Sequence, residues 1–266
     1  MSAAIFDAES SGVEADGELG MGAFCYWLDL SNNLGFWERA IKFAEMWRKW
    51  GSCEKYPRLV GVGNPHLAAA ALKSVDVFVA YVHGNGYAIQ FGEGETYSGE
   101  IWIGPPPQGN TNNSTIVYLG DKNVFPFPLS KLDLVVIASC NHAGAPNGQF
   151  PIVEELKNMG AKASIGITGY EKFLPKDSSE EVITLGGLTV GLYEKYAEKF
   201  WKYATDGYVE NGTKVYPTVR EAAKKAYWEL KKIYIPWQDP MGLHKGYLMP
   251  PFFYGTDDYL GNLVLQ

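Results

Sequence analysis

Two short apolar runs place the strongest limit on how this chain folds. Residues 77–82 and 132–139 are largely apolar and rich in Val, Leu and Ile. Runs of this length and composition are typical of strands that are buried on both faces, as in a parallel sheet. Such a sheet needs helices on each side to exclude water. The chain is therefore predicted to be an α/β protein with a mainly parallel sheet.

Segments with helical or strand periodicity alternate along the rest of the chain. Helices are expected at residues 36–50, 64–73, 149–159, 188–203 and 219–232. Further strands are expected at residues 24–30, 58–62, 163–168 and 262–265. Thr218 is followed three residues later by Glu221, the signature of a capping box at the start of the last helix. The alternation predicts a three-layer sandwich, with the sheet flanked by helices.

The chain is predicted to form one domain after an N-terminal arm. Residues 1–22 are small, acidic and glycine-bearing, which is typical of a loose arm, and residues 23–266 contain neither a repeat nor a strong linker. Residues 84–130 are rich in Gly, Pro and Asn and include strand-like pieces. We therefore expect a β-hairpin excursion there rather than another strand-helix-strand unit.

Composition narrows the classes of partner. Lys and Arg number 23 against 30 Asp and Glu, a formal net charge of −7, which argues against binding to nucleic acid or an anionic membrane. No stretch reaches the roughly 20 apolar residues of a membrane span, and the first residues do not resemble a secretory signal, so we expect a cytoplasmic protein. The three cysteines form neither a zinc spacing nor a disulfide framework, and no metal or cofactor is expected.

The two apolar runs end in residues that are able to perform chemistry. The first run is followed by His83 and Gly84, and the second by Cys140. Reactive groups collect beyond the carboxyl ends of strands in open α/β sheets, and neighbouring strands lie about 4.8 Å apart. The His83 and Cys140 side chains are therefore expected to meet if their strands are neighbours. A thiol beside an imidazole is a nucleophile beside its base.

Two further residues enter this prediction. Gly84 lacks a Cβ, so its backbone N–H and that of Cys140 are expected to stabilise a developing oxyanion. His142 is an alternative base, but we favour His83 because residue 142 falls in the loop that leads to the next helix. Purely structural roles stay open as well, namely a buried cysteine, a loop histidine and a turn glycine.

Both strand ends resemble the signatures of the caspase-like cysteine peptidases, a group that includes caspases, metacaspases, gingipains and CHAT domains. The signatures are an apolar strand ending in His-Gly and a second apolar strand ending in a small residue and Cys. Here they read Tyr81-Val82-His83-Gly84 and Ile137-Ala138-Ser139-Cys140. Residues 132–144 are most similar to the CHAT pattern. The resemblance implies a caspase-like fold and cysteine endopeptidase activity through a Cys140/His83 dyad.

The resemblance also implies residues that bind a protein or peptide substrate. Asp29, in the loop after the first strand, is a candidate acidic floor that selects Arg or Lys before the scissile bond, with a turn or helix-cap role as the alternative. The other candidates for substrate binding are Thr168, Gly169, Tyr170 and His142. Thr168 and Gly169 are expected to offer backbone hydrogen bonds to an extended substrate.

Two alternatives to the peptidase stay open at this point. The first is a catalytically silent caspase-like domain that binds other proteins. The second is another Cys/His hydrolase or acyltransferase on an α/β fold, because one fold supports several chemistries. For the peptidase itself, a regulatory protein partner is a further candidate, since activation of a single-chain enzyme is controlled outside the dyad.

Overall fold

The computed structural model describes the central part of the chain and much of its C-terminal half. The described residues are 21–25, 65–81, 83–84, 86–93, 96–104, 115–120, 128–129, 131–139, 150–167, 169–170, 188–233, 237–238 and 245–264. The expected helix at 36–50 and the expected strand at 58–62 lie outside these residues.

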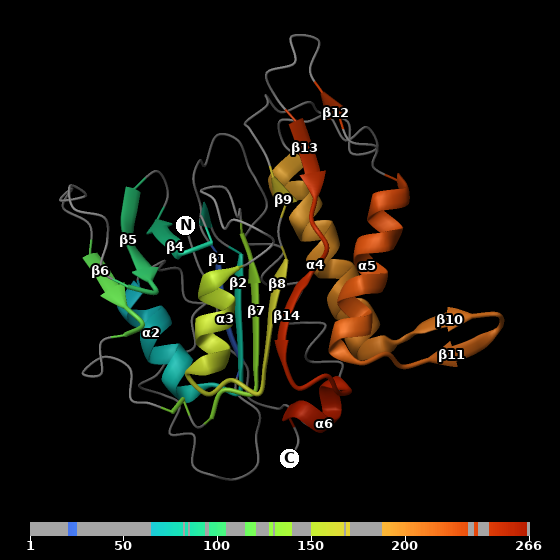
Figure 1. The fold of residues 1–266 in the computed structure, drawn as a ribbon, viewed down its shortest axis with the longest axis horizontal. Helices are drawn as coiled ribbons and strands as arrows, with labels where there is room; N and C mark the ends of the chain where they lie inside the picture. Colours follow the sequence, from blue (N-terminus) through green and yellow to red (C-terminus); the bar gives the residue numbers. More distant parts are fainter. Residues whose placement is uncertain are drawn as a thin grey trace.

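A five-stranded sheet forms the centre of the molecule (Figure 1). Its strands, in spatial order, are β1 (Met21–Cys25), β2 (Val77–Tyr81), β7 (Leu134–Ala138), β8 (Ala163–Ile167) and β14 (Phe252–Gly255). The first four strands are parallel, and β14 adds an antiparallel edge. Every residue of β7 and β8 is buried, as expected for strands covered on both faces. The prediction of a mixed α/β fold with a largely parallel sheet is confirmed.

Helices pack on both faces of the sheet at β8 and β14. Helix α3 (Pro151–Asn158) follows Phe150, whose ring lies over Gly166 of β8 and makes an edge contact with Phe252 at 5.8 Å between centroids. Phe253 is the next residue of β14 and therefore faces the other way. The guanidinium of Arg220, in α5 (Val219–Ile233), lies 5.5 Å from the centre of the Phe253 ring.

Helix α4 (Leu188–Asp206) packs on β7, β8 and α5. Lys199 of α4 donates to the Glu229 carboxylate of α5 at 2.9 Å, and the Tyr203 hydroxyl donates to the same carboxylate. Burial alone raises the pKa of Glu229, but Tyr203, Lys199 and Lys225 outweigh it and hold the pKa of that carboxyl below its ordinary value. The two helices are thus joined by a charged group as well as by apolar packing.

A four-stranded sheet lies beside the central one (Figure 1). It contains β3 (His83–Gly84), β4 (Ala88–Glu93), β5 (Thr96–Trp102) and β6 (Thr115–Tyr118), and α2 (Pro65–Ser74) packs against β5 and β6. The pairs β3–β4 and β4–β5 are antiparallel, so hairpins occur within the segment where an excursion was predicted. The parallel pairing of β5 with β6 was not expected from the sequence.

Two smaller strand groups complete the described structure. A hairpin of β10 (Tyr208–Glu210) and β11 (Thr213–Val215) projects from the end of the α4–α5 pair (Figure 1). Its turn has positive φ angles at Asn211 (50°) and Gly212 (79°), which an Asn-Gly hairpin turn requires. The strands β12 (Trp237–Gln238), β13 (Lys245–Leu248) and β9 (Gly169–Tyr170) form a three-stranded sheet.

Element boundaries agree with the sequence prediction for most helices and differ at the two ends of the described chain. The strand expected at 24–30 is β1, which starts three residues earlier, and residues 26–30 lie outside the described part. The strand expected at 262–265 is wrong, because Leu260–Val264 forms helix α6. The Asp258 carboxylate accepts from the Tyr259 backbone N–H at 2.7 Å and from Asn262 at 2.9 Å, which stabilises the first helical turn.

Among the described residues, no helix combines the length and the apolar composition that a membrane span requires.

Candidate functional site

The carboxyl ends of the parallel strands stop at one row of the central sheet. Tyr81 of β2 pairs with Cys25 of β1 on one side and with Ala138 of β7 on the other, and Ala138 pairs with Ile167 of β8. These residues are the last of their strands. His83 and Cys140 each follow this row by two positions in the chain. The strands that lead to His83 and Cys140 are therefore neighbours, which was the condition for the two side chains to meet.

A close packing contact joins the His-Gly segment to the end of β7. A Cβ built on Gly84 would lie 2.9 Å from the Ser139 Oγ, 3.2 Å from the Ser139 Cβ and 2.6 Å from the backbone oxygen of Ala88. The chain at Gly84 therefore passes directly against the residue that precedes Cys140. Ser139 is buried, and its backbone N–H donates to the Ile167 oxygen at 3.2 Å. The β7–β8 pairing thus continues up to the residue before the cysteine.

The structure describes only some of the predicted site residues. Cys140, His142, Asp29 and Thr168 lie outside the described residues. His83 is described as a position of β3, and Gly169 and Tyr170 as the two positions of β9. The geometry of the Cys140/His83 dyad and the roles of Asp29, His142 and Thr168 therefore stay predictions.

The segment after β8 is paired with a distant part of the chain. Gly169 and Tyr170 were expected to face an extended substrate, and in the structure they pair with Leu248 and Tyr247 of β13. Strand β13 pairs with one edge of β9. Among the described residues, β9 is the last strand of the β12-β13-β9 sheet, and no described strand pairs with its other edge. Sequence reasoning missed β13 because its four residues, Lys-Gly-Tyr-Leu, lack a clear strand pattern.

Two residues of the described strands were not considered as site residues from the sequence. Cys25 occupies the same row as the last residues of β2 and β7, so a thiol-bearing position lies at the carboxyl end of the central sheet. Glu100 of β5 is buried, with 7% of its surface exposed, and its carboxylate accepts a hydrogen bond from Trp102 Nε1. Periodicity alone does not reveal either, because both depend on how distant strands are paired.

The described residues contain no group of three or more His, Cys, Asp or Glu side chains that would hold a metal ion. The sequence matches no family model and no curated protein. Function is therefore inferred from the residues and geometry of this chain.

Proposed function

We propose that the protein is a cysteine endopeptidase with a caspase-like three-layer α/β fold, in which Cys140 is the nucleophile and His83 is the general acid and base. The main support is the register of the central sheet. Tyr81 pairs with Ala138, so the segments that carry His83 and Cys140 leave neighbouring strands at the same level. In open α/β sheets this edge is where reactive groups collect.

The contact between Gly84 and Ser139 also supports the proposal. The added-Cβ direction of Gly84 points at the Ser139 side chain, so these two residues face each other. The His-Gly segment and the end of β7 are therefore in direct contact at these two residues. His83 and Cys140 are each the next residue along the chain from this contact. A nucleophile and its base must lie within such short reach of each other.

The proposed reaction has two steps, acylation of Cys140 with cleavage of the peptide C–N bond and then hydrolysis of the thioester. The Cys140 thiolate attacks the scissile carbonyl carbon, and the oxyanion accepts hydrogen bonds from the backbone N–H groups of Gly84 and Cys140. The C–N bond then breaks, and the imidazolium of His83 gives its proton to the leaving amine. Neutral His83 then takes a proton from water as the water oxygen attacks the thioester carbon. The C–S bond breaks, which releases the acid product and restores the Cys140 thiolate beside a protonated His83.

The proposed substrate is an extended peptide. Strand β9 has one edge paired with β13, and its other edge is suited to pairing with a peptide that adds to the sheet. We further propose that Asp29 favours a basic residue before the scissile bond, since a carboxylate pairs well with a guanidinium in a partly desolvated pocket. Comparing Arg, Lys, Asp and Leu peptides on the wild-type protein and Asp29→Asn tests this preference.

The central test is a screen of fluorogenic peptides that vary at the residue before the cut. We expect Cys140→Ala to abolish cleavage, while Cys25→Ala and Cys53→Ala retain it, because only Cys140 is proposed to attack the substrate. Cys25 is the sharper control, since it lies in the same edge row as the end of β7. Full activity of Cys140→Ala, or loss of activity in Cys25→Ala alone, contradicts the proposal.

The wild-type protein and its cysteine variants also distinguish the two alternative functions, a different Cys/His enzyme and a silent interaction domain. Alkylation of Cys140 by iodoacetamide at neutral pH, without cleavage of any peptide, favours an acyltransferase or another Cys/His hydrolase, because a reactive thiolate is then present. A Cys140 that resists alkylation under conditions that modify free cysteine favours a silent interaction domain. Intact mass measured over time distinguishes these outcomes.

A further inference from the structure

A row of paired positions links the His-Gly segment to a buried carboxylate two strands away. His83 of β3 pairs with Gln90 of β4, and Gln90 pairs with Glu100 of β5. Directly paired positions of adjacent strands lie on the same face of a sheet. His83, Gln90 and Glu100 therefore occupy one row on one face of the four-stranded sheet.

This face is not the one that packs into the main core. The next row contains Gly84, Ile89, Ile101 and Val117, and its three apolar side chains belong to the hydrophobic core. Residues alternate between faces along a strand. Glu100 therefore lies on the opposite face, together with Trp102, which is buried but outside the core cluster.

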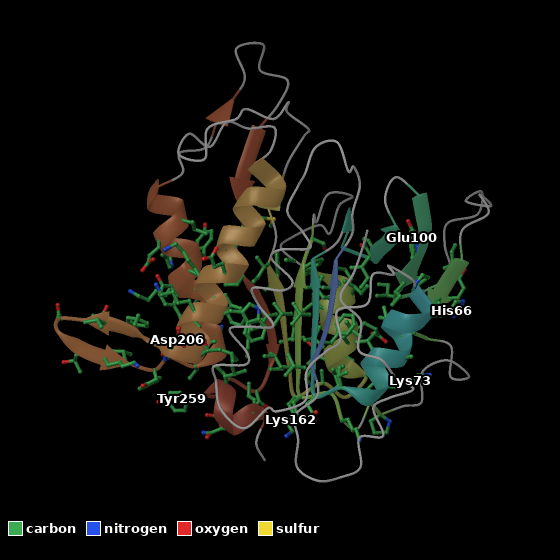
Figure 2. All side chains as sticks on the ribbon, turned by 180° about the vertical axis from the view of Figure 1, so that it is seen from behind. His66, Lys73, Glu100, Lys162, Asp206 and Tyr259 are labelled. Atoms are coloured by element: carbon green, nitrogen blue, oxygen red, sulfur yellow. The ribbon has the colours of Figure 1, made fainter. Side chains whose placement is uncertain are left out.

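Glu100 belongs to β5 and is labelled in Figure 2. Its surface is 7% exposed, and Trp102 Nε1 donates to its carboxylate. A buried carboxylate is costly unless it has partners, and Trp102 is one of them. Ala88 fills a buried position on the same face with an apolar side chain, so packing alone does not require a carboxylate there. In the described part, the titratable Tyr118 is on this face as well, because it pairs with Trp102.

We propose that Glu100 is a positioning residue, which acts through Gln90 to orient the His83 imidazole and stabilise its protonated form. Two strand spacings separate β3 from β5 by about 10 Å, which the side chains of His and Glu span with an amide between them. The register places position 90 between positions 83 and 100, and a glutamine amide is able both to accept from an imidazole N–H and to donate to a carboxylate. The role in catalysis rests on the proposed function, whereas the coupling of Glu100 to His83 does not.

The coupling is tested by measuring the pKa of His83 without any substrate. The chain has four histidines, so ¹⁵N-edited NMR titration resolves them, and His83→Asn assigns the signal. In Cys140→Ala protein, adding Glu100→Gln keeps an acceptor for Trp102 but removes the charge. We expect the pKa of His83 to fall by about 0.5 to 1 unit, since a nearby negative charge favours the imidazolium. Glu155→Gln, a charge removal on α3, is expected to leave that pKa unchanged.

A second variant protects this test against a folding defect. Gln90→Leu keeps the Glu100 charge but breaks the amide link, so the pKa of His83 is again expected to fall. The thermal midpoint of each variant is measured alongside. An unchanged pKa of His83 in both folded variants overturns the proposal, even when the protein cleaves peptides.

Kinetics then connect the coupling to the reaction. In the enzyme with Cys140 intact, we expect Glu100→Gln to lower kcat about 10- to 100-fold with little change in KM, as for other residues that orient a catalytic group. The alkaline limb of the pH profile should move to lower pH, because the imidazolium loses its proton earlier. A shift of the His83 pKa without any peptidase activity rejects the proposed function and retains the coupling.

Discussion

The absence of a Cβ at Gly84 allows the His-Gly segment to pack closely against the end of β7. Its position allows β3 to lie against Ser139 and the Ala88 oxygen at distances that a side chain would occupy. The Ser139 Oγ is able to rotate away from an added Cβ, but the Ala88 backbone oxygen is not. Glycine is therefore required here by close approach, independently of any special backbone conformation.

We predict that Gly84→Ala destabilises the protein by about 1 to 3 kcal/mol, the usual range for an overpacked site. Peptide cleavage should fall more steeply than stability, because the shift moves the backbone N–H proposed to bind the oxyanion. The matched control is Gly104→Ala, where an added Cβ has nothing within 4 Å. Urea unfolding and the fluorogenic assay are measured on both variants, and equal behaviour of the two removes Gly84 from the site.

The capping box of α5 is the clearest case of an element specified by its own sequence. The Glu221 backbone N–H donates to Thr218 Oγ1 at 3.3 Å, and the Thr218 N–H donates to Glu221 Oε2 at 3.0 Å. These bonds satisfy two N–H groups that the helix itself leaves without an acceptor. The predicted box is confirmed, and α5 starts at Val219 as its sequence indicates.

At this element, Thr218→Ala is predicted to lower the free energy of unfolding by about 0.5 to 2 kcal/mol, because the cap acceptor is lost. Thr218→Ser keeps the hydroxyl and should stay within a few tenths of a kcal/mol of wild type. Chemical denaturation with far-UV circular dichroism measures both. Equal losses in the two variants would mean that the methyl group, and not the hydroxyl, stabilises the helix.

Phe150 connects the layers of the whole molecule. It is fully buried, lies against Gly166 of β8 and Phe252 of β14, and immediately precedes α3. Its backbone N–H donates to the Tyr254 hydroxyl at 3.3 Å. One ring therefore anchors the start of α3 on two strands of the sheet.

We predict that Phe150→Ala costs about 3 to 5 kcal/mol, since it leaves a cavity between α3 and the sheet. The control Tyr216→Ala removes an aromatic ring that is 54% exposed and should change stability by less than about 0.5 kcal/mol. Differential scanning calorimetry compares the two. A small loss in Phe150→Ala would indicate that α3 is held mainly by Ile152, Val153 and Leu156.

Elements whose signals are local were predictable from the order of the residues. The buried runs of β2 and β7, the helices α2 to α5 and the capping box were predictable, because hydrophobic periodicity and capping residues act within a few turns. The same rules failed at Leu260–Val264, since a five-residue apolar stretch is ambiguous between strand and helix. There the Asp258 side chain decided the outcome.

Which distant segments share an edge or a row depends on how the chain packs in three dimensions. The pairing of β9 with β13, the level of Cys25 beside Tyr81, and the row from His83 to Glu100 all depend on strand register. Register depends on long-range packing, and a shift of one residue moves every side chain of a strand to the other face. The residues able to perform chemistry were visible in the sequence, whereas their neighbours followed from how the sheets are paired.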